Sequence, residues 1–347
     1  MSWQSILIPG YESGGKPIVS VIAKKTYVFA HGRVKAAEEQ VPIYHDEVPA
    51  DPQNPLGGET LAEPDIVPFK PKTDVVVVGK AHAPRGYRTN CMTCKVFVGP
   101  VHKAIRVYGE RKVEAKLIRG LSFTEAEPFK TRELGYRHAF GGVAKSKEGF
   151  AMPFPPNPLG KGFYLKGGIE DPEEIEVPCC EDPNSPIEPD ALVLGKYADW
   201  PRAPKPVSFG WTKPSFYPRN SYAGIVPEML PAQQGKDPKA GKDGRLDFRF
   251  YQGASEGMGE HSLEGNEHVK LIYMDPDHKV FEFALPSEKP AIAIGYGKDR
   301  TEVPVALHTV LIDKNNNKLS MVWRGCKESE GSEAPWDGGL PMSFVVE

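Results

Sequence analysis

Short segments in which hydrophobic and polar residues alternate occupy both ends of the chain. Alternation with a period of two is typical of a β-strand that buries one face. Turn residues separate several of these segments, with Gly99-Pro100, Asp275–Asp277 and Asn315–Asn317 at points where the chain reverses. No window of twelve or more residues has the 3.6-residue period of an amphipathic helix. The segments expected to form strands are 16–30, 33–43, 74–84, 94–109, 112–118, 245–252, 268–286, 308–325 and 342–347.

The middle of the chain, residues 128–244, has a different pattern. Segments such as 153–163 and 200–211 carry frequent prolines. Proline fixes φ and lacks an N–H, so neither a central strand nor a helix can run through such segments. Yet Trp200, Trp211 and other aromatic residues lie here, and disordered linkers contain few aromatic residues. We therefore expect ordered but irregular structure that packs on a β core.

These patterns predict an all-β, β-sandwich-like fold of packed antiparallel sheets with little helix. We expect an N-terminal β region at residues 1–127, an irregular region at 128–244 and a C-terminal β region at 245–347. The three regions can also form one continuous domain, and the two β regions can build one sandwich or two. The composition agrees with long loops, because 35 glycines and 35 prolines make up about a fifth of the 347 residues.

Charge, terminal sequence and cysteine content argue against several classes of protein. The net charge is −3, so no basic excess favours nucleic acid or an anionic membrane surface. The N-terminus lacks the basic and apolar segments of a signal peptide, and the longest aliphatic run, Val75–Val78, is too short to span a bilayer. Five cysteines, an odd number in a long chain, do not indicate a disulfide framework. We expect a cytoplasmic protein.

One segment matches a catalytic motif. Gly253–Gly257 has the G-x-S-x-G pattern of a nucleophile elbow, and Asp299 and His308 follow Ser255 in the order of an α/β-hydrolase triad. That motif needs a helix directly after the serine and a parallel sheet with crossover helices before it, and the sequence predicts neither. A glycine-rich loop is the favoured interpretation, and a hydrolase that uses Ser255 is an alternative.

Two groups of residues carry metal-ligand side chains. His261 and His268 lie close to two glutamates, but Gly265 interrupts the segment, and zincin histidines need a shared helix face. A structural loop is favoured there, with a metal enzyme at His261 and His268 as an alternative. Four cysteines can also supply a zinc site, although the offset between the first two points their side chains to opposite faces of a strand. We expect no cofactor and no catalytic residue, and metal binding stays an open question for Cys91, Cys94, Cys179 and Cys180.

Two neighbouring motifs resemble the signature of a bacterial protein family. Residues 136–142 read YRHAFGG and residues 157–163 read NPLGKGF, which is similar to the pattern R-AFGG … NP-GRGF of the domain of unknown function 2169 family (DUF2169). The sequence departs from the family pattern at Asn266 and His308, where the family has Asp, and it lacks the Tyr-Asp that often follows Gly224. Further similarities extend from about Val19 to Gly325, at residues 200–202 (W-PR), 223–224 (AG), 247–250 (D-F-x-F), 263–267 (L-GDE), 283–286 (F-LP) and 308–324 (DT-LID … WR).

The resemblance implies a function. Members of the family are encoded beside type VI secretion genes, and those studied act as adaptors or chaperones. They bind a toxic effector, often through its PAAR-repeat tip domain, and help to load it onto the VgrG spike. The resemblance therefore implies a cytoplasmic, non-catalytic binding protein. Its partners would be an effector, through a PAAR-repeat or toxin domain, and VgrG, with no role for nucleic acid or a membrane. A structural accessory component of the secretion apparatus is a further alternative.

Within the irregular region, we expect residues 128–231 to form, or to brace, the effector-binding surface. Proline-rich loops with aromatic residues offer broad contact area at a low ordering cost. Tryptophan, tyrosine and arginine dominate binding hot spots, which makes Trp200, Arg202, Trp211 and Tyr217 the anchor candidates. For the glycines a structural role is favoured, because glycine usually meets a backbone requirement. The residues that match the family motifs are Arg137, Phe140, Gly141, Gly142, Asn157, Pro158, Gly160, Gly162, Trp200, Arg202 and Glu267.

Overall fold

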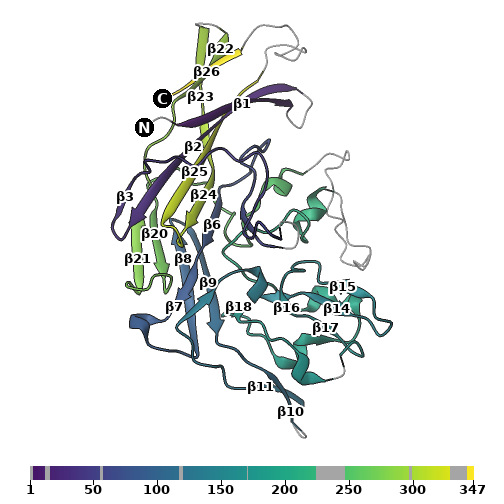
Figure 1. The fold of residues 1–347 in the computed structure, drawn as a ribbon. Helices are drawn as coiled ribbons and strands as arrows, with labels where there is room; N and C mark the ends of the chain where they lie inside the picture. The colour runs from purple at the N-terminus through teal and green to yellow at the C-terminus, as the bar shows by residue number, and fades with distance from the viewer. Residues whose placement is uncertain are drawn as a thin grey trace.

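The fold is known from a computed structural model, which describes residues 3–11, 16–54, 58–116, 120–169, 171–223, 247–296, 299–328 and 342–347. Strands dominate these residues, and every described helix is a short 3-10 helix, so the all-β prediction is confirmed. Two large sheets form one body, and a smaller irregular part lies beside it at the lower right of Figure 1. The two ends of the chain lie near each other, at the upper end of the sheets.

The larger sheet combines strands from both ends of the chain. Strand β2 pairs antiparallel with β25 along its length, from Ile18 opposite Glu328 to Val28 opposite Lys318. The edge strand β6 pairs parallel with β24, in an otherwise antiparallel sheet. In order, the sheet contains β1 (Gln4–Tyr11), β2 (Pro17–Ala30), β25 (Lys318–Glu328), β24 (Val305–Asp313) and β6 (Asp74–Val78), with β3 (Arg33–Ala36) also paired to β2.

A five-stranded sheet faces the larger one and also draws on several parts of the chain. Its central pair, β8 and β9, forms the hairpin that the sequence predicts at Gly99-Pro100. Its order is β18 (Cys180–Glu181), β9 (Val101–Tyr108), β8 (Cys91–Val98), β20 (His268–Ile272) and β21 (Val280–Ala284). A three-stranded sheet extends the fold with β23 (Asp299–Val303), β22 (Ile292–Tyr296) and β26 (Met342–Val346).

One hydrophobic core joins these sheets. It includes Val21 and Trp323 from the larger sheet, Val96 and Leu271 from the five-stranded sheet, and Ile294 from the three-stranded one. Each of these side chains is at most 1 % exposed. Burial on this scale is the main favourable term in folding. We call this part of the molecule the sandwich.

The outer face of the larger sheet is buried as well, which alternation alone does not predict. A covering segment, residues 37–54 and 58–73, lies over it and contains β4 (Val48–Pro49) and β5 (Thr60–Ala62). Lys24 of β2 is only 1 % exposed because the carboxylate of Asp65 and the carbonyl oxygen of Pro42 accept hydrogen bonds from its ammonium group. Polar residues on this face of the sheet therefore meet polar partners instead of water.

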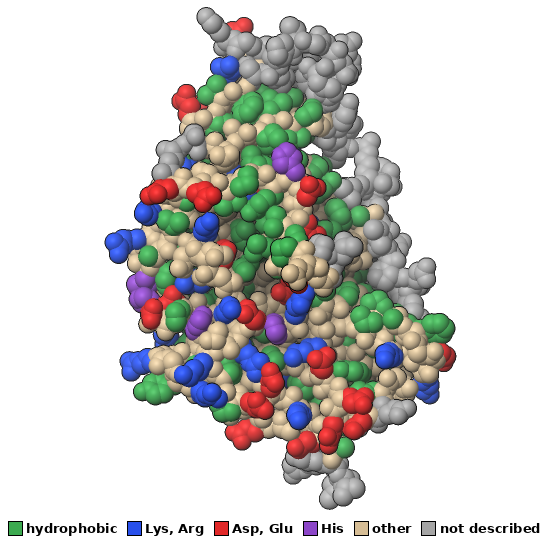
Figure 2. All heavy atoms as spheres, in the orientation of Figure 1, with side chains coloured by type: hydrophobic (Ala, Val, Ile, Leu, Met, Phe, Trp, Pro, Cys, Tyr) green, Lys and Arg blue, Asp and Glu red, His purple; other side chains and the backbone are tan. Residues whose placement is uncertain are grey.

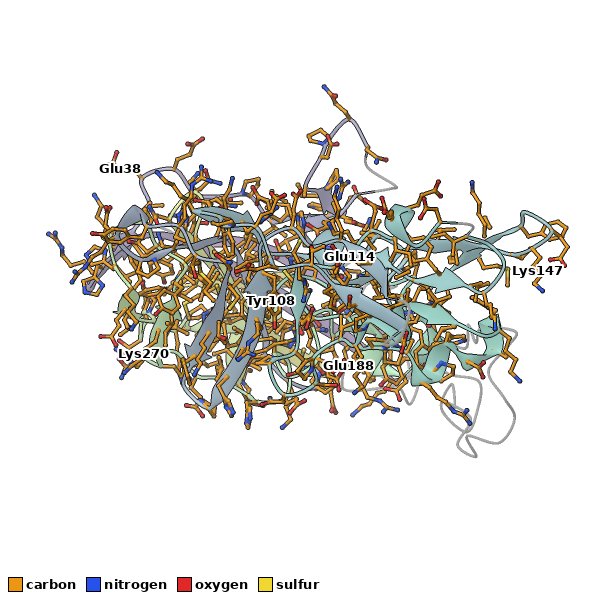
Figure 3. The ribbon with its side chains drawn as sticks, turned by 90° about the horizontal axis from the view of Figure 1, so that it is seen from below. Glu38, Tyr108, Glu114, Lys147, Glu188 and Lys270 are labelled. Carbon is orange, nitrogen blue, oxygen red and sulfur yellow. The ribbon has the colours of Figure 1, made fainter. Side chains whose placement is uncertain are left out.

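The irregular region has a hydrophobic core of its own. Phe140, Phe154, Phe163 and Trp200 pack edge to face or tilted, with the Phe154 and Phe163 ring centres 5.0 Å apart. We call residues 113–203 the middle module. In Figure 3, Lys147 of this module and Lys270 of β20 lie at opposite sides of the molecule. The module contains β10 (Val113–Lys116), β11 (Gly120–Phe123), β13 (Phe140–Gly141), β14 (Val143–Lys145), β15 (Ala151–Pro153), β16 (Lys161–Gly162), β17 (Tyr164–Leu165), β19 (Val193–Leu194), η3 (Pro172–Glu174), η4 (Pro189–Leu192) and η5 (Tyr197–Arg202), together with β18, β12 (Thr131–Glu133) and η2 (Tyr136–His138).

The module is attached to the sandwich through β18 and β12. Strand β18 pairs with β9, and β12 pairs with β7 (Lys80–His82). At this junction the buried Arg111 guanidinium forms an ion pair with the buried Glu181 carboxylate and donates to the carbonyl oxygen of Pro178. A short 3-10 helix, η1 (Pro84–Gly86), follows β7.

One strand prediction is wrong. Residues 245–252 were expected to form a strand, but the described part forms the 3-10 helix η8 (Phe248–Tyr251), which contacts η6 (Arg219–Ala223). The Asp247 carboxylate accepts a hydrogen bond from the N–H of Arg249, so it caps the start of the helix. Asp is among the residues favoured for this role, and its local hydrogen bond competes with strand pairing.

Candidate binding cleft

A cleft of about 590 Å³ separates the middle module from a loop of the sandwich. One wall comes from the module and the segment after it, and it contains five prolines, Trp200 and Tyr217. The other wall is the glycine-rich loop, residues 252–260, which includes the predicted nucleophile elbow. The volume lies in the usual range for ligand sites, and the mix of apolar lining and a few polar groups is typical of such sites.

The glycine-rich loop is held rigidly against β6. Both carboxylate oxygens of the buried Asp74 accept hydrogen bonds, at 3.0 Å each, from the N–H groups of Gly253 and Ala254. Lys70, also buried, pairs with the same carboxylate at 2.6 Å. The carbonyl oxygen of Met258 in turn accepts from the N–H of Val75. The outer edge of β6 is therefore occupied by the loop, and one wall of the cleft is fixed to the sandwich.

A buried ion pair lies beneath the cleft. The guanidinium of Arg219 pairs with both oxygens of the Glu63 carboxylate and also donates to the carbonyl oxygens of Phe250 and Thr212. A bidentate pair with further hydrogen bonds is the arrangement in which a buried charge pair is tolerated. Beside it, the Tyr136 hydroxyl lies 2.7 Å from Thr212 Oγ1, and burial raises the pKa of Tyr136 to about 12. These polar groups in the floor of the cleft thus form hydrogen bonds with one another.

The groups that a ligand can reach lie at the rim. The Arg249 guanidinium carbon lies over the Tyr222 ring, 4.3 Å from the ring centre. Arg249 also forms an ion pair with Asp247. Across the opening, Lys205 and Glu256 form an ion pair at 2.8 Å, with both side chains more than 70 % exposed. Exposed tyrosine and arginine side chains are the types most often found as anchors in protein interfaces. The rim can therefore contact an extended segment of another chain.

Ser255, the nucleophile of the hydrolase alternative, lies in the loop wall, where other groups occupy its hydroxyl. Ser255 is 1 % exposed, and its hydroxyl donates to the carbonyl oxygen of Ser208 at 2.6 Å. Lys103 donates to Ser255 Oγ at 3.1 Å and to the carbonyl oxygen of Glu256 at 2.6 Å. Burial lowers the pKa of Lys103 to about 8. Neither Asp299 nor His308 is among the hydrogen-bond partners that Ser255 has in the described structure.

The predicted metal ligands are not assembled by the described residues, which contain no group of three or more His, Cys, Asp or Glu side chains placed to hold a metal ion. His261 and His268 are exposed. Cys94 is buried, and burial raises the pKa of its thiol to about 12, whereas Cys91 on the same strand is exposed. This agrees with the expected offset of their side chains. Cys179 and Cys180 are both buried.

The two motifs at residues 136–142 and 157–163 lie side by side in the middle module. Strand β13 pairs parallel with β16, and the Asn157 side-chain amide donates to the carbonyl oxygens of Tyr136 at 2.8 Å and Phe140 at 2.9 Å. Gly141 has φ of +148°, and a Cβ there would overlap the carbonyl oxygen of Asn157. A Cβ would also come within 3.0 Å of backbone oxygens at Gly142 and Gly160, and of the Pro178 ring at Gly162. In the structure, these motif residues hold two irregular segments together.

The chain was compared with known proteins. The model of the family described as "Uncharacterized protein conserved in bacteria (DUF2169)" matches residues 14–324, which is most of the chain. The chain belongs to this family. No curated protein and no solved structure matches it. Among the described residues, no helix is long and apolar enough to cross a bilayer.

The anchor candidates and the residues that match the DUF2169 motifs differ in how much surface they offer. Trp200 is 3 % and Trp211 4 % exposed, and the Trp211 ring N–H donates to the carbonyl oxygen of Leu61. Both side chains therefore pack inside the protein and offer little surface to a partner. Arg202 is exposed and Tyr217 is half-buried in the cleft wall. Of the others, Arg137 is exposed, Phe140 and Asn157 are fully buried, and Pro158 and Glu267 are half-buried.

Several cleft residues were not candidates in the sequence. Arg219 and Glu63 are separated by 156 positions, and no local pattern pairs them. Tyr222 and Arg249 were also missed, although Arg249 falls within the D-F-x-F motif that the chain shares with the DUF2169 family. The motif gave only an indirect signal, because Arg249 occupies its variable position and the residue in the pattern is Asp247, with which Arg249 pairs.

Proposed function

We propose that this protein is a non-catalytic, cytoplasmic adaptor that binds a type VI secretion effector and helps to load it onto the VgrG spike. The class of partner comes from the family resemblance, and the cleft supplies a binding surface for it. The observation that supports the proposal most is the cleft itself, with rigid prolines on one wall and Tyr222 and Arg249 at its rim. In this proposal, an extended segment of the effector occupies the cleft.

The chemistry of the cleft suits this role. Prolines and a loop bonded to Asp74 are already ordered, so a partner segment binds without the entropic cost of fixing them. Tyr217 and Tyr222 offer flat apolar faces, and Arg249 offers hydrogen-bond donors to carbonyl or carboxylate oxygens. The Glu260 and Glu256 carboxylates on the opposite wall can accept from a basic or amide side chain.

Affinity purification of the tagged full chain from its native cytoplasm tests the proposal. The wild-type chain is expected to recover an effector with a PAAR-repeat or toxin domain near a one-to-one ratio, identified by mass spectrometry. The double variant Tyr222→Ala, Arg249→Ala should lose at least tenfold of the recovered partner, because it removes two contact groups at the rim. Tyr87→Ala is the matched control, since Tyr87 is 72 % exposed and lies outside the cleft lining.

Two results of this purification would contradict the proposal. Full recovery of the effector by the double variant, with an unchanged thermal melt, would exclude the cleft as the binding surface. Recovery of VgrG in a strain that lacks the effector would favour a structural accessory component instead, because a loading adaptor needs the effector to join the two.

A serine hydrolase is the second candidate, favoured by the 3.1 Å contact between Lys103 and Ser255. A lysine with a lowered pKa can act as general base for a serine nucleophile. Against this, the Ser255 hydroxyl is bonded to Ser208 and almost wholly buried. A fluorophosphonate probe tests it: labelling of the wild-type chain that Ser255→Ala abolishes would support a hydrolase. Metal analysis of the purified protein tests the alternative at His261 and His268.

A further inference from the structure

The larger sheet buries an arginine that has no carboxylate partner among the described residues. Arg324 of β25 is 5 % exposed and lies on the outer face of the sheet, opposite Ile22 of β2. It donates to the carbonyl oxygen of Val67 at 2.8 Å and to the hydroxyl of Ser20. Its Nε–H, which is buried, has no acceptor. The Cys326 thiol also interacts with the guanidinium, but a thiol sulfur is a weak acceptor.

The other cations buried under the covering segment are neutralised. Lys24 pairs with Asp65 at 2.7 Å, and Lys70 pairs with Asp74 at 2.6 Å. His308 supplies no charge, because burial and then the nearby Lys70 and Arg324 hold its pKa well below the usual value. Burial also lowers the pKa of Arg324, but a guanidinium stays protonated at neutral pH. Among the described residues of this layer, the charge of Arg324 therefore has no acidic counter-ion.

A small pocket opens beside this charge. It has a volume of about 190 Å³ and lies between the β1–β2 pair and the covering segment, with Arg324 and Ser20 as its polar side chains. Hydrophobic side chains gather in this upper part of the molecule, over β1 and β2, in Figure 2. The remaining lining residues are apolar or glycine: Ile8, Pro9, Gly10, Ile18, Ile66, Val67 and Pro68.

We propose that this pocket binds a carboxylate carried on a short branched aliphatic group, with Arg324 as the counter-ion. A carboxylate matches a guanidinium in charge and in its two parallel acceptor positions. Its aliphatic part would contact Ile8, Ile18 and Ile66. An isolated buried charge is costly, so a ligand that neutralises it gains more than the same contact would give in water. This site is separate from the cleft and does not depend on the proposed function.

Two sources can supply this chemistry, a free branched-chain acid or the C-terminal residue of a protein chain. The probes are isovalerate, its neutral isostere isovaleramide, and a hexapeptide that ends in valine with either a free or an amidated C-terminus. Each is titrated into the purified full-length protein by calorimetry or by ligand-observed NMR. For a fragment of this size, a Kd of about 1 mM is expected for isovalerate. The amide should bind at least tenfold more weakly, because it lacks the charge.

The peptide arms distinguish the two sources. A free C-terminus that binds at least tenfold tighter than isovalerate indicates a protein chain end, and equal or weaker binding indicates a free acid. Equal affinity of isovalerate and isovaleramide, or no binding of any of the acids, would overturn the proposal. This comparison uses the wild-type protein, so it does not depend on whether a variant folds.

A variant then tests the role of Arg324 itself. Arg324→Met keeps the length of the side chain and removes the charge, so isovalerate binding should fall below detection. The thermal midpoint of the unliganded variant should stay the same or rise, because an unpaired buried charge is removed. Arg33→Met is the matched control, since Arg33 is exposed on β3 and outside the pocket. Wild-type affinity in a folded Arg324→Met variant would contradict the assignment.

Discussion

The sandwich and the middle module reach a buried core by different routes. In the sandwich, long strands satisfy the backbone through ladders, and alternating side chains fill the space between two sheets. In the module, the strands are four residues at most, and side chains such as Asn157 replace the missing ladder bonds. The stability of the module therefore depends on a few close backbone contacts, whereas the stability of the sandwich comes from many hydrogen bonds and packing contacts.

The largest expected difference concerns a glycine in each part. Gly141→Ala in the module should cost about 4 kcal/mol, because the added Cβ overlaps Asn157 and the residue also has a positive φ. Gly32→Ala, in the turn between β2 and β3, should cost only about 1 kcal/mol, because its φ is also positive but nothing lies within 4 Å of the added Cβ. Urea unfolding followed by tryptophan fluorescence measures both. Equal losses would remove the distinction between the two regions.

The next effect concerns the asparagine at the centre of the module. Asn157→Ala leaves the carbonyl oxygens of Tyr136 and Phe140 buried without a donor, so we expect a loss of about 2–3 kcal/mol. The control is Asn90→Ala in the sandwich, where the lost bond to Glu125 is exposed and the change should stay within about 0.5 kcal/mol. The same urea experiment serves here. A comparable cost for the two variants would contradict the proposed role of Asn157.

A smaller effect belongs to the sandwich and depends on pH. The folded state holds the pKa of His308 well below its usual value of 6.5, because the ring is buried beside two cations. As the pH falls through 6.5, the unfolded chain takes up a proton that the folded chain does not, so stability is lost on acidification. We expect a loss of up to about 1.4 kcal/mol from this residue between pH values of about 7.5 and 5.5. His308→Leu should remove that part of the pH dependence; an unchanged slope would exclude it.

The smallest effect concerns the ion pair across the cleft opening. Lys205 and Glu256 are exposed, so a double-mutant cycle with alanine should give a coupling below about 0.5 kcal/mol that disappears in high salt. A larger coupling would mean that this ion pair links the two walls of the cleft and stabilises their contact. The cleft would then resist opening, and the two regions would unfold together.

Sequence patterns were sufficient for the sandwich because one buried face imposes a period of two. Strands β2 and β9 fall within the expected segments, and β8, β24 and β25 overlap theirs but extend three residues beyond them at one end. The parallel pairing of β6 with β24 was not predictable, since strand partners depend on contacts across more than 200 positions. The covering segment was also missed, because charged residues such as Lys24 are ordinarily exposed and only the fold supplies their partners.

The candidate site was harder to predict from the sequence than the fold was. The glycine-rich loop was recognised, but its role as a cleft wall follows from Asp74, which lies 180 positions before Ala254. The aromatic residues of the irregular region predicted ordered structure, and several of them pack in a hydrophobic core in the described part of this region. Their density did not separate the buried Trp200 from the half-buried Tyr222 at the rim, because both lie near prolines and only packing decides how far each is buried.

The central claim, that an effector segment occupies the cleft, is tested most directly by photo-crosslinking in the native cell. The photoreactive residue p-benzoylphenylalanine replaces Tyr222 at the rim in one strain and Tyr87 on the sandwich in another. Our account predicts a crosslink from position 222 to an effector with a PAAR-repeat or toxin domain, and none from position 87. Crosslinks to the effector from position 87 alone would contradict it.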